Sequence, residues 1–226
     1  SDDSKKAPSG EPGTAETTAS ATNTGFAGTG ARAAEEPDYV DDGTQEAINK
    51  GIGYLRGVQL EDGGWPVAPG QDASHLGITV VAAYGLQSAG VPKDDPMMAK
   101  ALDYIARYAK DDGGIYDEGL RNYTTSIGVM ILKGADEQKY AEQIKGALAF
   151  LKSLQWDQGE GLQPESADFG GAGYGSHQRP DLSNTQWFVQ AMKELGVDKD
   201  DPAMEKAVIF VSRTQAGEAA KGYWVS

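Results

Sequence analysis

Apolar side chains recur every three to four residues along four similar segments of the chain, which is the spacing of one face of an α-helix. The segments begin at Lys50, Lys100, Lys145 and Lys206. A glycine-rich turn and a second, less polar helical segment follow each of the first three, with second helices expected at residues 76–89, 124–133 and 182–195. Alternation of apolar and polar residues, the pattern of strands, is missing. The sequence therefore predicts an all-α domain of helix pairs.

The helix pairs are copies of one another. Residues 91–101 and 197–207 are identical at eight of eleven positions, at an offset of 106 residues. Both copies contain Asp-Asp-Pro, which places carboxylates at a helix N-terminus and proline in its first turn. Gly90 and Gly196 precede these copies where a helix C-terminus favours glycine. We therefore expect seven main helices, forming about three and a half helix pairs over residues 43–226.

The N-terminal segment differs from the repeats. Residues 1–24 contain no Val, Ile, Leu, Met, Phe, Trp or Tyr, so they cannot bury enough apolar surface to offset the entropy of ordering. Residues 1–42 are predicted to be a disordered acidic tether. Polar segments of this kind follow the lipidated cysteine of bacterial lipoproteins, which gives the hypothesis of an upstream lipid anchor and an extracytoplasmic location.

Charge and composition exclude several function classes. The 34 acidic and 20 basic residues give a net charge of −14, which argues against binding to nucleic acid. Without cysteine the chain has no disulfides, thiolate zinc sites, iron–sulfur clusters or cysteine nucleophile. The longest strongly apolar run, residues 78–86, is too short for a transmembrane helix.

One turn carries a family resemblance. Lys50-Gly-x-x-Tyr54-Leu55-x-x-x-Gln59, followed by Gly64-Trp65, is similar to the QW repeat of the squalene–hopene cyclases and of the prenyltransferase/squalene oxidase repeat family. Gln155 with Gly159, and Gln215 with Gly217, resemble degraded copies. The resemblance covers residues 43–226 and implies a partial or open α/α toroid, with the second helix of each pair inside and the inner helix N-termini around a cavity. It implies structural roles, joining adjacent outer helices, for Gln59, Gly64, Trp65, Gln155 and Gln215.

The catalytic motifs of toroid enzymes are missing or stand at the start of an outer helix. The Asp-x-Asp-Asp string of the triterpene cyclases that this motif resembles occurs once, as Asp198-Lys199-Asp200-Asp201, in the repeated segment that starts the last outer helix. No cysteine is present for a prenyltransferase zinc site or a thioester. We therefore expect a non-catalytic binding or assembly module, part of a larger protein or complex. The alternative is a terpenoid- or saccharide-active enzyme with its site at the inner helix N-termini. A deep apolar cavity with a buried acid of raised pKa would favour the enzyme, and a shallow polar one the binding module.

The long loop at residues 156–181 and the helix after it hold the candidate site, because a loop of this length is uncommon unless it binds something or is disordered. Asp181 is the candidate proton donor of the enzyme alternative, and the repeat register places His75 opposite it. The candidate ligand-binding residues are His75, Tyr123, Tyr174, His177, Arg179, Asp181, Ser183, Asn184 and Trp187. A simpler interpretation makes Asp181 or Ser183 an N-cap and Arg179 its salt-bridge partner. No spacing predicts a metal site, and no cofactor is expected.

The last helical segment has an unusually apolar surface. Val208, Ile209, Phe210 and Val211 form a continuous run, and such a helix is normally buried on more than one side. We expect this run to contact a protein partner or a portion of the polypeptide beyond Ser226. The alternative is that the N-terminal tail or residues 216–224 fold back over it.

Overall fold

The computed structural model describes residues 42–175 and 178–214. The helices are α1 (Asp42–Val58), α2 (Leu76–Ser88), α3 (Pro96–Ala106), α4 (Arg121–Asp136), α5 (Ala141–Ser153), the 3₁₀ helix η1 (Gln158–Glu160), α6 (Leu182–Glu194) and α7 (Pro202–Ser212). Isolated bridges are the only extended pairings within these ranges. The predicted all-α class with seven main helices is thus confirmed. The tether predicted for residues 1–42 lies outside the described residues except for Asp42, and it and the lipid anchor stay predictions.

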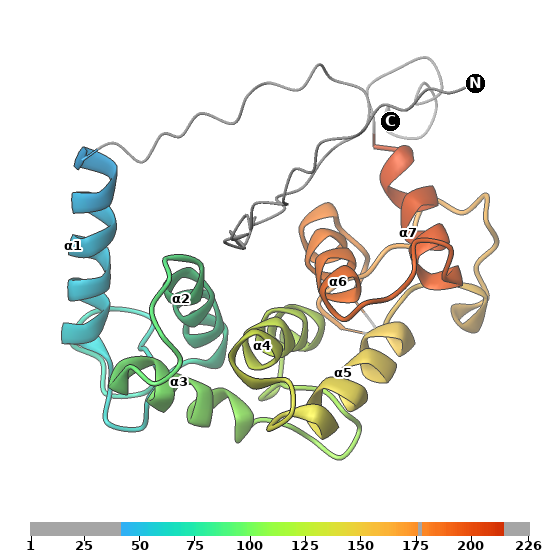
Figure 1. The fold of residues 1–226 in the computed structure, drawn as a ribbon. Coiled ribbons are helices and arrows are strands. Elements are labelled where there is room, and N and C mark those ends of the chain that lie inside the picture. Colours follow the sequence, from blue (N-terminus) through green and yellow to red (C-terminus); the bar gives the residue numbers. More distant parts are fainter. Residues whose placement is uncertain (1–41, 176–177, 215–226) are drawn as a thin grey trace, which may run out of the picture. The chain divides into compact units, whose positions relative to one another are not determined.

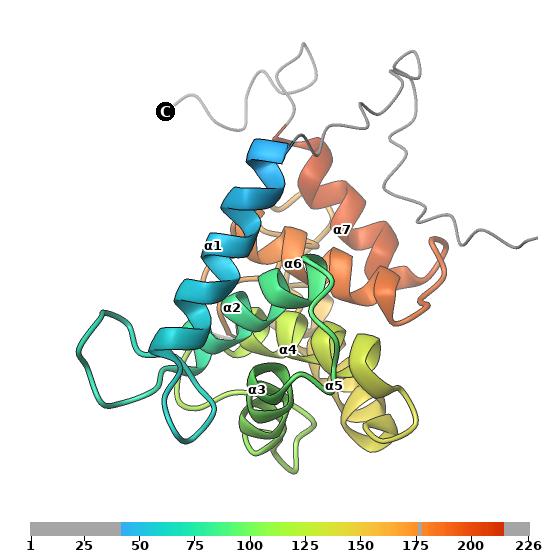
Figure 2. The same cartoon turned by 60° about the vertical axis from the view of Figure 1, so that its left-hand side comes forward.

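The helices form two layers. Helices α2, α4 and α6 lie side by side in the inner layer, since α4 packs against both of the others. In the outer layer, α3 packs against α2 and α4, α5 against α4, and α7 against α6 (Figures 1 and 2). Eleven of the sixteen residues of α4 are buried, which makes it the centre of the core. This alternation of inner and outer helices is that of a partial α/α toroid, as predicted.

The Asp-Asp-Pro segments start the outer helices as expected. Asp95 caps α3 by accepting a hydrogen bond from Met97 N, and Asp201 caps α7 by accepting one from Ala203 N. The same carboxylates join consecutive outer helices, because Asp95 pairs with Arg56 of α1 at 2.9 Å and Asp201 with Lys152 of α5 at 2.6 Å. One repeated residue therefore both begins a helix and ties it to the preceding outer helix.

Glutamine side chains make a second tie between outer helices. Gln59 Nε2 donates to Gly63 O and to Met97 O in the first turn of α3, both at 2.9 Å. Gln155 Nε2 donates to Gly170 O at 2.9 Å and to Ala203 O of α7 at 2.8 Å. Each glutamine thus joins the turn after its own helix to the next outer helix. Gln215 lies outside the described residues.

The turn after α1 is built around Trp65. Its ring is 1% exposed, and its indole Nε1 donates to Leu55 O at 2.8 Å. A Cβ at Gly64 would lie 2.5 Å from Ser74 Cβ and 2.8 Å from the Tyr104 ring, so only glycine fits beside the tryptophan. The turn after α5 has the same requirement at Gly171, where a Cβ would lie 2.6 Å from Pro180 Cβ and 2.8 Å from the Phe210 ring. Phe210 is 2% exposed there, so the expectation that it faces a partner is wrong.

The middle joint, from α3 to α5, differs from the other two. Ala109 stands where the other turns have glutamine, so no side chain spans this joint in the same way. Instead Gly113, with φ of +90°, lies directly against Gly146 of α5; a Cβ at Gly146 would lie 3.0 Å from Gly113 Cα. A close backbone contact is common to all three joints, because a Cβ on Gly63, Gly113 or Gly170 would collide with a carbonyl oxygen of the next outer helix. The middle joint differs in lacking the glutamine and in having glycine on both sides.

One local expectation was wrong. Helix α4 begins at Arg121 and ends at Asp136, so it is longer at both ends than the predicted 124–133. Its start depends on Leu120, which adopts a left-handed conformation with φ of +51°, and on a tertiary hydrogen bond from Asn122 N to Tyr174 O at 2.9 Å. The long loop also has structure of its own, because Asp157 and Glu160 form a capping box that starts η1.

Candidate functional site

The N-terminal ends of the three inner helices lie together. Asn122, in the first turn of α4, donates from Nδ2 to Asn184 O in the first turn of α6 at 3.0 Å. At the start of α2, a Cβ on Gly77 would lie 3.1 Å from Leu120 Cδ1 of α4. Sequence positions 77, 122 and 184 therefore meet at one end of the inner layer, where the resemblance implies a cavity.

A threonine in each inner helix fixes this arrangement. Thr79, Thr125 and Thr185 are fully buried, and each Oγ1 accepts a backbone N–H from the preceding turn at 2.8–3.0 Å. The repeat register aligns Thr79 with Thr185, whereas the equivalence of Thr125 becomes evident only from the structure. These hydrogen bonds hold the turns against the inner helices.

Asp181 is the N-cap of α6. Its Oδ1 accepts from Asn184 N at 2.8 Å, and its Oδ2 accepts from Asn184 Nδ2 at 2.6 Å. The predicted ion pair with Arg179 is wrong, because Arg179 Nε instead contacts Asp168 Oδ1 at 3.0 Å, within the same long loop. His75 occupies the equivalent cap position of α2, where its Nδ1 accepts from Ile78 N at 3.4 Å.

A buried polar network continues from Asp181 into the inner layer. Asn184 is 1% exposed and Asn122 is fully buried. Ser126 Oγ donates to Asn122 Oδ1 at 3.1 Å, while Asn184 Oδ1 has no hydrogen-bond partner among the described residues. Ser183 is exposed beside this network, and His177 lies outside the described residues, so the two are not brought together as a nucleophile and base.

Four aromatic rings form a continuous row on the inner layer. The ring centroids of Tyr84 and Trp187 are 5.7 Å apart, those of Trp187 and Tyr123 6.0 Å, and those of Tyr123 and Tyr174 6.4 Å. Gln190 Nε2 fixes one end by donating to Tyr84 OH at 2.7 Å. Burial, with a smaller contribution from Tyr174, raises the pKa of the Tyr123 hydroxyl. We call these four residues the aromatic row; the sequence indicated three of them and missed Tyr84.

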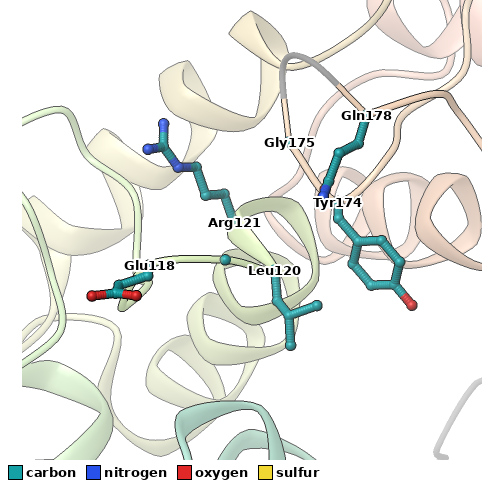
Figure 3. Close-up of a pocket in the computed structure, with 7 residues that line it drawn as sticks. Glu118, Leu120, Arg121, Tyr174, Gly175 and Gln178 are labelled. Carbon is teal, nitrogen blue, oxygen red and sulfur yellow. The ribbon is translucent and has the colours of Figure 1, made fainter.

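The row ends at a pocket of about 300 Å³ between the start of α4 and the long loop. Its lining residues are Glu118, Gly119, Leu120, Arg121, Tyr174, Gly175 and Gln178. Five of them are exposed, and three are polar or charged. Figure 3 shows the side chains of Arg121 and Tyr174 diverging from facing backbone segments. The Arg121 guanidinium lies 4.7 Å from the Tyr116 ring centroid, in a cation–π contact. This pocket is open to solvent, and its lining combines apolar surface with the polar side chains of Glu118, Arg121 and Gln178.

Every carboxyl with a shifted pKa in the described chain is shifted downward. A hydrogen bond from Arg56 lowers the pKa of Asp95, and one from Lys152 lowers that of Asp201. Burial opposes ionisation of Asp157, but the hydrogen bond from Lys206, the Gly159 backbone N–H and the charge of Lys206 together outweigh it and leave its pKa lowered. The fourth, Asp136, is lowered first by the Lys139 backbone N–H and then by Lys93. Asp95, Asp157 and Asp201 stabilise contacts of the outer helices, whereas Asp136 ends the inner helix α4.

Two further observations concern ligands and membranes. Within residues 42–175 and 178–214, no three histidine or acidic side chains gather closely enough to hold a metal ion. None of the helices in these ranges combines the length and the apolar character that crossing a membrane requires.

Comparison with known proteins gives a consistent family. The profile of the squalene-hopene cyclase N-terminal domain matches residues 37–133. A squalene–hopene cyclase of Bradyrhizobium diazoefficiens is 37% identical over 181 residues, which cover 80% of this chain and 20% of that protein. One from Zymomonas mobilis is 24% identical over 215 residues, covering 85% of this chain and 32% of that protein. Enfumafungin synthase of Hormonema carpetanum is 39% identical over 71 residues, covering 31% of this chain and 5% of that protein.

The chain therefore spans a third or less of each of these relatives. Its helix-pair repeats, its buried Trp65 and the paired contacts of Gln59 and Gln155 agree with the matches. The family-model match and the two squalene–hopene cyclases therefore support a squalene cyclase-like prenyltransferase/squalene oxidase repeat family for this chain.

Proposed function

We propose that this domain is a non-catalytic binding module, part of a larger protein or complex, and that its aromatic row binds an elongated apolar ligand of the isoprenoid class. The aromatic row is the observation that carries the proposal. Its rings extend from α2 across α6 and α4 to the pocket, at centroid spacings of 5.7–6.4 Å. Aromatic rings offer apolar surface to a hydrocarbon chain, and the polar side chains in the pocket lining suit a hydroxyl at its end.

The state of Asp181 supports a non-catalytic role. Both of its carboxylate oxygens accept hydrogen bonds from Asn184, so the group is held as a helix cap. A proton donor for an alkene would need a protonated carboxyl directed into a closed apolar cavity. The pocket beside the aromatic row is open, and five of its lining residues are exposed.

Ligand titration tests the binding function. Adding farnesol to the protein should quench tryptophan fluorescence saturably, because Trp187 lies in the row. Tyr174→Leu should weaken binding about two- to tenfold, the usual contribution of one aromatic contact. Tyr174 is 40% exposed, so this change should leave the fold intact. Tyr54→Leu is the matched control, because Tyr54 is 57% exposed on α1 and outside the row. Equal binding by both variants would refute the assignment.

Cyclase-like catalysis is the second candidate, and the match to squalene–hopene cyclases favours it. Incubation with squalene, followed by gas chromatography and mass spectrometry, should yield no cyclised product. A product that disappears in Asp181→Asn would overturn the non-catalytic proposal. An oligosaccharide such as cellohexaose serves as the comparison ligand, and quenching by it instead of by farnesol would contradict the isoprenoid class.

A further inference from the structure

A cavity of about 210 Å³ lies between α3, the end of α4 and the turn that leads into α5. The buried part of its lining is apolar and comes from Leu102 of α3, Ala135 of α4 and the ring of Tyr140, each of which is 7% exposed or less. An engineered apolar cavity of about 150 Å³ in another protein holds a benzene molecule. This cavity therefore has room for one ring or for a branched aliphatic side chain.

The more exposed part of the lining is charged and consists of two ion pairs. Lys93 Nζ pairs with Asp136 Oδ2 at 3.1 Å, and Asp136 Oδ1 also accepts the backbone N–H of Lys139 at 3.0 Å. Both oxygens of Asp136 therefore have partners within the protein. Lys139 Nζ lies 3.7 Å from Asp103 Oδ1, beyond hydrogen-bond length, and the two side chains are 59% and 75% exposed. This second pair is open to exchange with the charged groups of a ligand.

The Tyr140 hydroxyl is buried and has no hydrogen-bond acceptor among the described residues. Its charged neighbour is Lys139, whose Nζ lies 4.8 Å from the ring centroid, and an ammonium group can only donate. Leaving a buried hydroxyl without an acceptor costs free energy, so such a group in a cavity lining points to a ligand that supplies the acceptor. Lys139 and Tyr140 together offer two donors to one carboxylate.

The internal repeat shows that helix packing does not require this lining. At the offset of 106 residues, Asp103 corresponds to Ile209, and Ala99, another lining residue, corresponds to Glu205. Helices α3 and α7 nevertheless begin with the same aspartate cap and proline, and each packs against an inner helix. The acidic group at position 103 and the small side chain at position 99 are therefore particular to this cavity.

We propose that this cavity binds a free α-amino acid with an apolar side chain. Its carboxylate accepts hydrogen bonds from Lys139 and Tyr140, its ammonium group donates to Asp103, and its side chain fills the apolar part of the cavity. A zwitterion matches this lining because Lys139 and Asp103 present opposite charges 3.7 Å apart, so a simple anion would face Asp103 and a simple cation would face Lys139. The cavity lies at the end of α4 and the pocket of the aromatic row at its start, so the two sites are independent.

Titration of the isotope-labelled full chain with L-phenylalanine, followed by NMR, tests the proposal. The backbone amide signals of residues 102–104 and 136–140 should shift saturably. The analogue 3-phenylpropionate lacks the ammonium group and 2-phenylethylamine lacks the carboxylate, so each should bind at least about tenfold more weakly. Absence of saturable shifts would overturn the site. Equal binding of phenylalanine and either analogue would overturn the assignment of a zwitterion.

Tyr140→Phe separates a ligand-binding role of the hydroxyl from a structural one. Because the hydroxyl has no partner in the free protein, this variant should keep or raise the melting temperature, yet bind phenylalanine about three- to tenfold more weakly. Lys139→Met removes the ammonium group and should weaken binding about tenfold. Lys199→Met is the matched control, since the Lys199 side chain is 85% exposed beside Asp200, and it should bind as the wild type does. Wild-type affinity in Tyr140→Phe or in Lys139→Met would refute the proposal.

Discussion

Replacing Gln155 tests whether the glutamine ties stabilise the repeat array. Gln155 is 3% exposed, and Gln155→Met keeps its length while removing both hydrogen bonds. Ala203 O lies in the first turn of α7, where the helix supplies another donor, whereas Gly170 O loses its side-chain partner in a buried turn. An unpaired buried carbonyl costs about 1–3 kcal/mol and the second hydrogen bond about 1 kcal/mol. The expected destabilisation is about 2–4 kcal/mol.

Urea unfolding followed by circular dichroism at 222 nm measures this change, and the melting temperature should fall on the order of 10 °C. Gln59→Met removes the same two kinds of hydrogen bond from a half-buried side chain that water can reach, so its effect should be smaller. Gln45→Met is the exposed control and should change little. A loss under about 1 kcal/mol for Gln155→Met, or a larger loss for Gln59→Met, would refute the reasoning.

Three further predictions concern the same domain. Gly170→Ala should prevent folding or cost more than about 3 kcal/mol of stability, because its Cβ would collide with the Lys206 carbonyl. Gly161 is also at positive φ but has open space around it, so Gly161→Ala should cost only about 1 kcal/mol, as measured by thermal unfolding. The pKa of Asp157 is lowered in the folded state, so this carboxylate stabilises the fold above its unfolded pKa near 4, and the stabilisation is lost as the pH falls through its folded pKa. Asp157→Asn should therefore reduce the loss of stability on acidification, measured by denaturation at about pH 2–5. Asp181→Ala should destabilise α6 by about 1 kcal/mol and Asp181→Asn by less, since asparagine also caps helices; equal losses would contradict the capping role.

Much of the fold could be predicted because its signals are local. In the Asp-Asp-Pro segments, a few adjacent residues specify where a helix starts, and Asp95 and Asp201 cap α3 and α7 as expected. The start of α4 was not predictable in this way. It depends on the left-handed Leu120 and on a hydrogen bond to Tyr174, which is more than fifty residues away. The capping box of η1, by contrast, could have been predicted from the local pattern Asp157-x-x-Glu160, but it was not.

The candidate site was harder to predict than the fold. Tyr84 is 103 residues from Trp187, and only the packing of α2, α4 and α6 brings their rings together. Nothing in the local sequence distinguishes Tyr84 from a tyrosine of the outer surface. The assignment of Arg179 failed for a related reason. Two carboxylates flank it in sequence, and the turn geometry of the loop selects Asp168 over Asp181.

The contact between Gly113 and Gly146 has a consequence for how the domain comes apart. The joints before and after it add the hydrogen bonds of a glutamine side chain to a close backbone contact, whereas this joint has glycine on both sides and lacks the glutamine. A single added methyl group at Gly146 would press α5 away from the turn after α3. In a linear array, cooperativity depends on the coupling between neighbouring units. A methyl group at Gly146 should therefore weaken the coupling of α3 to α5, while α4, which packs against both helices, still holds the two sides in one cooperative unit.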